Sequence, residues 1–386
     1  MDEIKLRKQA VVMYLSGHTP TDICNELNKS RPWFYKWLKR YQANHKDDWF
    51  IEQSRRPHTV AKKIDRDIEN RVIQIRQKLE NISYSQIGAI SIQWEFKKLN
   101  IEPPPVWTID RIIKKHNLTR KKLKSSKKQN EYPDYGSVYT HQLDLVGPRY
   151  IKNAGKFYFC NIIDTNTHCV HVNPVQNKAS LGVVNAVVRF WKQFGIPDYL
   201  QMDNELSFRG SNRHPHSFGK LIRFALSNNV TPVFIPQAEP WRNGIIEKFN
   251  DTFDKKFFRT QIFKDANDLA ASAKTFETFH NLNYRYRVNN NQTPVDVHKM
   301  NQNDSYLEKD YEIPEYIPLE SGDIIVIRFI RSDRKLNIFG ETFVLNPDLI
   351  YNYVEAFISI EFQALKIYSD NKLIQEFPYV VPVDWM

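Results

Sequence analysis

The pattern of apolar residues changes near Tyr135, and this change limits the folds that the rest of the chain can adopt. Before Tyr135 apolar residues recur at helical spacing, whereas beyond it they alternate with polar residues as in strands. Strands are expected at residues 138–146, 157–163, 168–172, 199–202 and 233–235, and helices at 180–194 and about 218–226. A three-stranded meander followed by alternating helices and strands predicts an α/β core, with a mixed five-stranded sheet and helices on both faces.

Three acidic residues stand at notable places in this pattern. Asp144 lies in the first expected strand, Asp203 follows the fourth, and Glu247 lies near the start of a helix after a loop punctuated by Pro and Gly. They lie on different elements, so they converge only if the chain folds. Divalent cations such as Mg²⁺ prefer carboxylate oxygens and keep several waters, which leaves positions for a substrate phosphate. The three residues therefore predict a metal site.

Length and composition set broad limits. The chain has 386 residues and is 41% hydrophobic, which predicts two to four domains, each with its own core. No apolar run approaches the roughly 20 residues that cross a bilayer, and the start lacks a signal-peptide core, so we expect a cytoplasmic protein without a membrane partner. Cys24, Cys160 and Cys169 have neither disulfide-framework nor metal-finger spacing, and we expect reduced thiols.

Positive charge is concentrated in the N-terminal third. Residues 1–130 hold 28 of the 55 Lys and Arg residues but 14 of the 44 Asp and Glu residues, so the surplus of 14 there exceeds the net charge of +11 for the whole chain. Such a region favours nucleic-acid binding, because cations displace the counterions condensed on the phosphate backbone. A merely solvated surface is the alternative.

The first helical region, residues 1–53, has the pattern of a helix-turn-helix domain. Helices are expected at residues 4–16, 21–27 and 31–41, with Thr21 and Ser30 as caps. The third helix turns aromatic residues inward and basic residues outward, as expected of a recognition helix. The candidate DNA-binding residues are Arg31, Lys36, Lys39 and Arg40. An ordinary three-helix bundle is the alternative.

A second helical region follows a basic linker. Residues 54–63 contain Arg55 and Arg56 beside a proline, a segment suited either to the minor groove or to a plain flexible linker. Residues 64–120 are expected to form a second helix-turn-helix domain with helices at 65–79, 85–99 and 108–116. Its candidate DNA-binding residues are Arg111, Lys114 and Lys115. Residues 121–135 form another basic linker.

The C-terminal region is again β-like. After a linker at residues 291–318, strands are expected at 323–329, 336–339, 341–345, 354–362 and 364–368. Five short strands in about 60 residues predict a small β-barrel over residues 319–386. Its role is open between a surface that contacts DNA and an appendage that only stabilises the chain.

The segments around the three acidic residues carry a family resemblance. They are His141–Asp144, Gln201–Asn204 and Pro240–Phe249, together with Tyr284–Val288 leading to Gln292–Pro294. They resemble the ribonuclease H-like core of DDE transposases and retroviral-type integrases, above all bacterial insertion-sequence transposases, with residues 136–290 as the core. The N-terminal region resembles the helix-turn-helix modules of these transposases, and the C-terminal region resembles their β domain.

The resemblance implies a function. Asp144, Asp203 and Glu247 would be the catalytic residues and would bind Mg²⁺ or Mn²⁺, two ions in the expected mechanism. Lys248 and Lys255 would contact DNA phosphate, and Arg328, Arg331 and Lys335 are further DNA-contact candidates in the C-terminal domain. The partners would be double-stranded DNA, as element terminal repeats and target, and further copies of the chain on paired ends. A bacterial, nucleoid-associated location follows from the same resemblance.

The chain departs from the family pattern at three points. Glu239 has the usual separation from Asp203, with 35 residues between them, whereas 43 separate Glu247; the helical phase and the Asn-Gly-x-x-Glu context favour Glu247. Glu205 stands where Gly is common, and Asp254 stands where Lys or Arg is common. The last two departures favour an alternative, a catalytically silent DNA-binding regulator derived from a transposase. A ribonuclease H-type nuclease is a third hypothesis, weakened by the helix-turn-helix regions.

Overall fold

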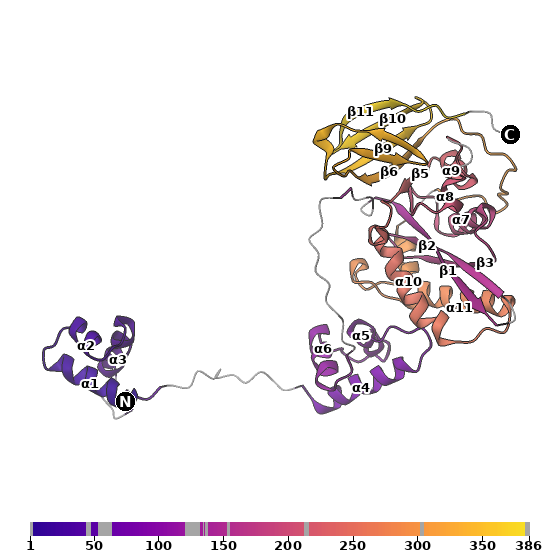
Figure 1. The fold of residues 1–386 in the computed structure, drawn as a ribbon. Coiled ribbons are helices and arrows are strands. Elements are labelled where there is room, and N and C mark those ends of the chain that lie inside the picture. The colour runs from indigo at the N-terminus through magenta and orange to yellow at the C-terminus, as the bar shows by residue number, and fades with distance from the viewer. Residues whose placement is uncertain are drawn as a thin grey trace. The chain divides into compact units, whose positions relative to one another are not determined.

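The protein has two compact units, Met1–Ile64 and Asp65–Met386, each described here by itself. The computed structural model describes residues 3–43, 48–52, 64–119, 132–133, 135, 138–152, 155–211, 216–301 and 305–382. Arg55 and Arg56, with most of the two predicted basic linkers, lie outside the described residues. Figure 1 shows a helical first unit, and a second unit of three further helices and a large mixed sheet with flanking helices.

The first unit packs three helices around a small core. They are α1 (Glu3–Leu15), α2 (Pro20–Glu26) and α3 (Arg31–Ala43). Phe34 and Ile23 are fully buried at its centre. Thr19, and not the predicted Thr21, caps α2, since its hydroxyl accepts a hydrogen bond from the Asp22 N–H at 3.3 Å. Pro20 then occupies the first helical position, where its missing N–H leaves no intrahelical bond unmade.

The second unit begins with the second predicted group of helices. They are α4 (Arg66–Glu80), α5 (Ala89–Lys98) and α6 (Val106–Lys115). Val72, Ile92 and Ile109, one from each helix, are fully buried. The α4–α5 connection packs on the α/β core, where the Tyr84 ring meets Phe276 edge-on at 5.3 Å between centroids. These helices therefore belong to the same compact unit as the sheet.

The large sheet contains nine strands in the order β11-β10-β9-β6-β5-β4-β1-β2-β3. Its first five strands along the chain are β1 (Thr140–Ile151), β2 (Gly155–Asp164), β3 (Val170–Val175), β4 (Tyr199–Met202) and β5 (Thr231–Phe234). The others are β6 (Asp323–Phe329), β9 (Tyr353–Ser359), β10 (Ala364–Ser369) and β11 (Lys372–Pro378). A separate pair is formed by β7 (Lys335–Ile338) and β8 (Glu341–Val344).

The mixed character of the sheet agrees with the sequence, but the five-strand count and the separate C-terminal barrel are not confirmed. β1 pairs antiparallel with β2 and parallel with β4, and β5 is parallel to β4. β6 then pairs in parallel with β5, through Val233 with Ile325 and Phe234 with Val326, so that the C-terminal strands extend the same sheet. The sequence contains a sign of this, because Ile324–Ile327 is apolar on both faces, as in a central strand.

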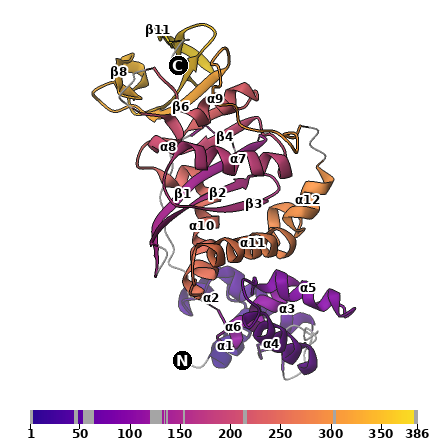
Figure 2. The same cartoon turned by 90° about the vertical axis from the view of Figure 1, so that its right-hand side faces the viewer.

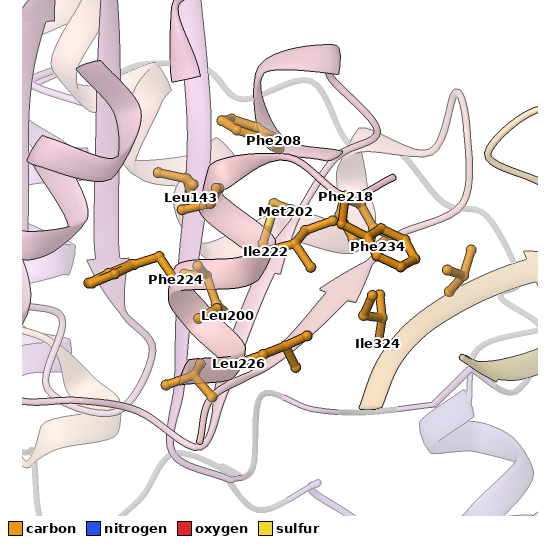
Figure 3. Packing of buried hydrophobic residues seen from close by; sticks show 14 of the residues in the cluster. Leu143, Leu200, Met202, Phe208, Phe218, Ile222, Phe224, Leu226, Phe234 and Ile324 are labelled. Atoms are coloured by element: carbon orange, nitrogen blue, oxygen red, sulfur yellow. The ribbon is translucent and has the colours of Figure 1, made fainter. Parts of the chain in front are cut away.

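Helices cover both faces of the core strands, as predicted (Figure 2). On one face lie α7 (Ser180–Phe194), α8 (Leu206–Arg209) and α9 (Lys220–Ser227). Figure 3 shows Phe224 and Leu226 of α9 packing with Leu200 of β4 in this core. On the other face lie α10 (Gly244–Lys256) and α11 (Ala266–Asn283), whose Phe253 and Phe276 pack with Phe159 of β2.

Short elements complete the chain. They are α12 (Pro294–Met300) and the 3₁₀ turns η1 (Pro240–Asn243), η2 (Phe258–Thr260), η3 (Arg287–Asn289) and η4 (Pro347–Leu349). None of the described helices is long and apolar enough to cross a bilayer. Cys24, Cys160 and Cys169 are buried free thiols.

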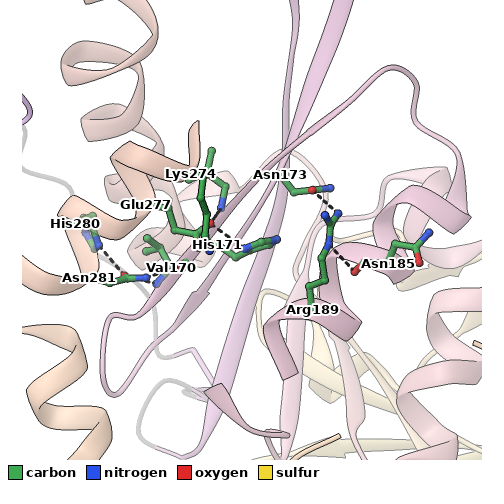
Figure 4. Close-up of polar contacts among 10 residues, drawn as sticks. Val170, His171, Asn173, Asn185, Arg189, Lys274, Glu277, His280 and Asn281 are labelled. Atoms are coloured by element: carbon green, nitrogen blue, oxygen red, sulfur yellow. Dashed lines mark hydrogen bonds and ion pairs between the residues drawn. The ribbon is translucent and has the colours of Figure 1, made fainter. Parts of the chain in front are cut away.

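Polar side chains of α11 bind the outer edge of β3 (Figure 4). The Asn281 amide accepts from the Val170 N–H and donates to the Val170 carbonyl, both at 2.9 Å. Glu277 accepts from the Val172 N–H at 3.1 Å and from His171 Nδ1 at 2.9 Å. These bonds satisfy backbone groups that an edge strand would otherwise leave open to another chain.

Candidate active site

Buried amide side chains fix the start of α10 against the sheet. Gln142 Oε1 accepts a hydrogen bond from the Ile246 N–H at 2.9 Å. Asn243 Nδ2 donates to the Leu143 carbonyl at 3.2 Å and its Oδ1 accepts from Gln201 Nε2 at 3.2 Å. Three polar side chains from β1, β4 and η1 thus meet below the first turn of α10.

This amide network explains why the three acidic residues lie close together. Side chains two apart on an extended strand point to the same face, so Asp144 shares a face with Gln142, and Asp203 with Gln201. Because both glutamines contact the start of α10, its first turn, which contains Glu247, lies over the face that bears both aspartates.

Asp144 is held by asparagines. Asn250, three residues after Glu247 on α10, donates from Nδ2 to Asp144 Oδ2 at 2.6 Å. Asn161 of β2 donates in turn to Asn250 Oδ1 at 2.8 Å, which fixes the orientation of the Asn250 amide. Burial and the negative charges of Asp203 and Glu247 raise the pKa of Asp144 to about 7, against the opposing effect of these hydrogen bonds.

The other two acids feel the same environment. Burial raises the pKa of Asp203, and the charge of Glu205 adds to this, although the Glu205 N–H donates to Asp203 Oδ1 at 3.0 Å. Burial, followed by the charge of Asp203, raises the pKa of Glu247. The charges of Asp203 and Glu247 act on Asp144, and the charge of Asp203 acts on Glu247, so the three carboxyl groups form a negative, oxygen-rich cluster whose repulsion bound divalent cations would relieve.

The donor set suits Mg²⁺ or Mn²⁺, but the side chains are not arranged as a complete ligand set. Among the described residues, no group of three or more His, Cys, Asp or Glu side chains is close enough together to hold a metal ion. The three acids interact electrostatically through a partly buried space, and a cation would have to draw them closer.

Glu239, whose separation from Asp203 is the one usual in the family, contacts Tyr353 and Arg242. Its carboxylate accepts from the Tyr353 hydroxyl at 2.8 Å and pairs with Arg242 Nε at 3.0 Å. These partners tie it to β9 of the C-terminal strands. This position supports Glu247 as the third acid, with the longer separation from Asp203.

Two departures from the family pattern have ionic partners. Glu205 caps α8 and forms an ion pair with Lys178, whose positive charge lowers the pKa of Asp203. Asp254 on α10 pairs with Arg149 at 3.0 Å and with Arg259 at 2.5 Å. At both places the acidic residue forms an ion pair with a basic side chain that would otherwise face solvent.

Arg328, an expected DNA contact, is instead buried against the loop that follows β4. It is 8% exposed, and burial lowers its pKa to about 10. Its guanidinium donates to Asn204 Oδ1 at 2.6 Å and to the Ile235 carbonyl at 3.1 Å. Because Asn204 follows Asp203, β6 supports the loop that presents this carboxylate.

The predicted DNA-binding residues of the first unit lie on or near the outer side of α3. Lys36 pairs with Glu52 at 2.7 Å, and Arg40 donates to the Ile51 carbonyl at 3.1 Å. Arg31 donates to the Thr21 hydroxyl at 3.3 Å, and Lys39 is exposed. Arg31 and Lys39 are the more accessible of the four, since the other two also hold the segment that follows α3.

In the second unit, α6 exposes the expected cations. Arg111 and Lys114 are exposed, and the Arg111 guanidinium lies 5.5 Å from the ring centre of Trp107, itself 65% exposed. Lys115 instead pairs with Glu69 of α4 at 2.6 Å. Trp107, Arg111 and Lys114 are spaced so that they lie on one face of α6. The tryptophan was not among the predicted DNA-binding residues.

The expected phosphate contacts on α10 share one acid. Lys248 and Lys255 lie 3.1 Å and 2.5 Å from the Asp251 carboxylate and remain largely exposed. Surface pairs of this kind contribute little to stability and exchange readily for another anion.

Several polar residues around the site were missed by sequence reasoning. They are Gln142, Asn161, Asn243 and Asn250, together with Lys178. Asn250 had a signal, since it lies one helical turn after Glu247. The others gave none, because their partners are distant in sequence.

Comparisons with known proteins agree with this picture. A family model of the homeodomain-like domain matches residues 1–48, the region of α1 to α3. A protein of Spiroplasma virus SpV1-C74, named putative integrase ORF3, is 23% identical over 286 residues, which cover 68% of this chain and 78% of that protein. The resemblance to transposases and integrases is confirmed.

Solved structures of integrases are also similar to this chain. The integrase catalytic core of HTLV-2, in complex with magnesium, is 16% identical, with 42% of this chain and 99% of that chain covered and a TM-score of 0.32. A chain of the simian T-cell lymphotropic virus intasome, in complex with a PP2A regulatory subunit, is 14% identical, with 80% and 97% covered and a TM-score of 0.36.

Proposed function

We propose that this protein is a DNA transposase that binds the terminal repeats of an element, cleaves its ends and transfers the strands to target DNA. The observation that carries the proposal is the cluster of Asp144, Asp203 and Glu247, in which burial raises all three pKa values and the charges of Asp203 and Glu247 raise the pKa of Asp144 further. Lys178 acts on one member, Asp203, and lowers its pKa without reversing the rise. Perturbed acids of this kind are typical of functional sites.

The chain's own residues have distinct roles in this proposal. Asp144, Asp203 and Glu247 would hold Mg²⁺ or Mn²⁺, which when bound activates an attacking hydroxyl and stabilises the leaving oxygen. Asn250 orients the Asp144 carboxylate, and Asn204, held by Arg328, fixes the loop of Asp203. The first helical unit and α4–α6 would bind end DNA as two modules, and copies of the chain would assemble on paired ends.

A catalytically silent regulator is the second candidate. Two observations favour it, since Glu205 neutralises Lys178 and Asp254 neutralises Arg149 and Arg259. These three ion pairs reduce the positive charge available to a DNA phosphate near the acids. Such a protein would bind DNA without cutting it.

The deciding experiment is a cleavage and strand-transfer assay. The DNA comes from the flanks of the gene, the cation is Mg²⁺ or Mn²⁺, and the variants are Asp203→Asn and Glu247→Gln. Because bound metal contributes several kcal/mol to such reactions, each substitution should lower the rate on the order of 10³-fold, with DNA binding retained. The exposed-side variant Asp251→Asn is the matched control and should stay active. Wild-type binding without cleavage would instead establish the regulator.

A further inference from the structure

A cleft of about 500 Å³ lies between α5 and the segment that follows α11. Trp94 and Lys97 line it from α5, and Arg285, Asn291, Gln292 and Lys299 line it from the opposite side. The second side contains the segment from Tyr284 to Pro294 that the sequence analysis matched to the family without assigning it a role. The two walls thus come from the second helical region and from the α/β core.

Specific contacts hold the walls together. Gln86, just before α5, donates to the Arg285 carbonyl at 3.2 Å and accepts from the Arg285 N–H at 2.8 Å. The hydroxyl of Tyr284, whose side chain is buried, donates to the Tyr84 carbonyl at 2.8 Å. The cleft is therefore built into the unit, because its two walls are joined by hydrogen bonds from side chains of one wall to backbone groups of the other.

The charge of the cleft is positive and largely uncompensated. Arg285, Lys97 and Lys299 line it with a single acid, Asp296. Asp296 is already used, because its carboxylate accepts from the Thr293 N–H in the capping box of α12. In the described chain no carboxylate pairs with Lys97 or Lys299, whereas their neighbours Lys78 and Lys98 share Glu95.

An aromatic platform and amide groups accompany these cations. The Arg285 guanidinium lies 3.5 Å from the ring centre of Trp94, and one of its nitrogens donates to the Asn291 carbonyl at 2.8 Å. The planar guanidinium, held over the ring, presents its remaining N–H groups in a fixed fork, an arrangement that suits phosphate oxygens. Asn291 Oδ1 is buried and has no hydrogen-bond partner, so the cleft also contains an unused acceptor.

We propose that this cleft binds the sugar-phosphate backbone of DNA, with Arg285, Lys97 and Lys299 contacting phosphates. The ligand rests on the proposed function, which supplies DNA as the substrate. DNA is favoured over an acidic peptide because one wall belongs to the module that carries α6, with its exposed Arg111 and Lys114, and the other follows directly from α11 of the core. A strand in the cleft contacts both regions at once, and so couples recognition of DNA to its placement on the core.

The test measures salt-dependent binding by the full-length protein. The probe is a fluorescein-labelled 40-base-pair duplex, without divalent cations, between about 50 and 200 mM salt, a range over which phosphate contacts dominate the change in affinity. The variant Lys97→Ala/Lys299→Ala is compared with Lys309→Ala/Lys372→Ala, which removes two exposed lysines that do not line the cleft. Each lost phosphate contact lowers the slope of log K against log salt by about 0.9, so we expect a decrease of about 1 to 2 for the cleft variant and none for the control.

Equal slopes for the cleft variant and the wild type overturn the proposal, and so do equal decreases in both double variants. A cleft variant that loses only the binding of a poly-glutamate peptide, with an unchanged duplex slope, assigns the cleft to an acidic protein partner instead. Arg285→Lys keeps the positive charge but removes the planar guanidinium. It is expected to weaken duplex binding with little change in the slope of log K against log salt. The binding assay does not require cleavage. A wild-type protein that binds DNA without cutting it therefore refutes the proposed transposase activity but not the assignment of the cleft to the DNA backbone.

Discussion

Two buried carboxyl groups in the same α/β core have opposite surroundings. Glu277 on α11 is 1% exposed and is bound by His171, Lys274 and the Val172 N–H. Burial raises its pKa, but these partners outweigh burial and leave the pKa below its usual range. Asp144 on β1 has Asp203 and Glu247 as its charged neighbours, and its pKa rises to about 7.

The difference separates a structural acid from one that we propose to be functional. Glu277 is paired within the chain, and its bonds close the edge of β3. Within the described ranges Asp144 has no cationic partner, so the fold carries an electrostatic cost that bound cations would remove. Both carboxyl groups are buried, so burial does not distinguish them. The sign of the neighbouring charges does.

The largest effect on stability is expected for Glu277→Gln. Removing one member of a buried ionic network leaves its partners without compensation, and we expect a loss of about 2–4 kcal/mol in the free energy of unfolding at pH 7, measured with urea. A depressed pKa contributes stability above the unfolded value, and this is lost as the pH falls through the folded pKa. The stabilities of the variant and the wild type should therefore converge in acid.

The control Lys274→Ala removes a mostly exposed partner and should cost less than about 1 kcal/mol. If Glu277→Gln lowers the free energy of unfolding no more than Lys274→Ala does, Glu277 contributes no more to stability than an exposed acid.

Asn250→Ala tests whether Asp144 depends on its asparagine. Partners that orient metal ligands typically matter 10–100-fold, so we expect a comparable decrease in strand transfer and a higher half-saturating Mg²⁺ concentration. A metal titration of the activity checks both effects. The matched variant Asn283→Ala, at an exposed position of α11, should behave as wild type. An unchanged Mg²⁺ dependence would show that the 2.6 Å contact has no role in positioning.

Asp144→Asn should stabilise the metal-free protein at neutral and alkaline pH. A carboxyl group whose pKa is raised by folding favours the folded state below its unfolded value, and this contribution disappears as the pH rises through the folded pKa of about 7. At pH 8 we expect the variant to be more stable by about 1–2 kcal/mol, with little difference near pH 4. Thermal unfolding in EDTA at both pH values measures this, and added Mg²⁺ should stabilise only the wild type. A variant less stable than wild type at pH 8 would contradict the proposed repulsion among the three acids.

The smallest effect is expected for Glu205→Gln, which releases Lys178. An exposed ion pair contributes up to about 1 kcal/mol, so duplex binding should tighten by no more than about fivefold. Equilibrium binding at low salt measures the change. Adding Lys178→Ala to this variant should cancel the gain. If the gain persists in the double variant, Lys178 is not the released cation.

Local sequence pattern predicted many elements but not their long-range pairing. The bounds of α7, β4 and β6 agree with the expectation, since each segment has a clear apolar period between turn residues. α11 was not predicted, because its inner face carries Glu277, His280 and Asn281, which interrupt the apolar stripe. The β5–β6 pairing is non-local, and the apolar run Ile324–Ile327 indicates a central strand without indicating its partner.

The same limit applies to the site. The three acids could be chosen from residue type and motif, and their assignment as catalytic residues stays a prediction. Gln142, Gln201 and Asn243, which place α10 over the aspartates, were beyond sequence reasoning because each binds a group more than 40 positions away or on another element. Lys178 was likewise found only through its contact with Glu205.

The pairing of β5 with β6 sets an order of events during synthesis. Val233 leaves the ribosome roughly 90 residues before its partner Ile325, a delay of about 5–18 s at bacterial to eukaryotic elongation rates. Arg328, which holds the loop of Asp203, arrives with the same late strand. A growing or prematurely terminated chain can thus form both helical regions while its acidic loop still lacks this support. Under the proposed function, the regions assigned to DNA recognition are therefore complete before the loop that carries Asp203 has this support.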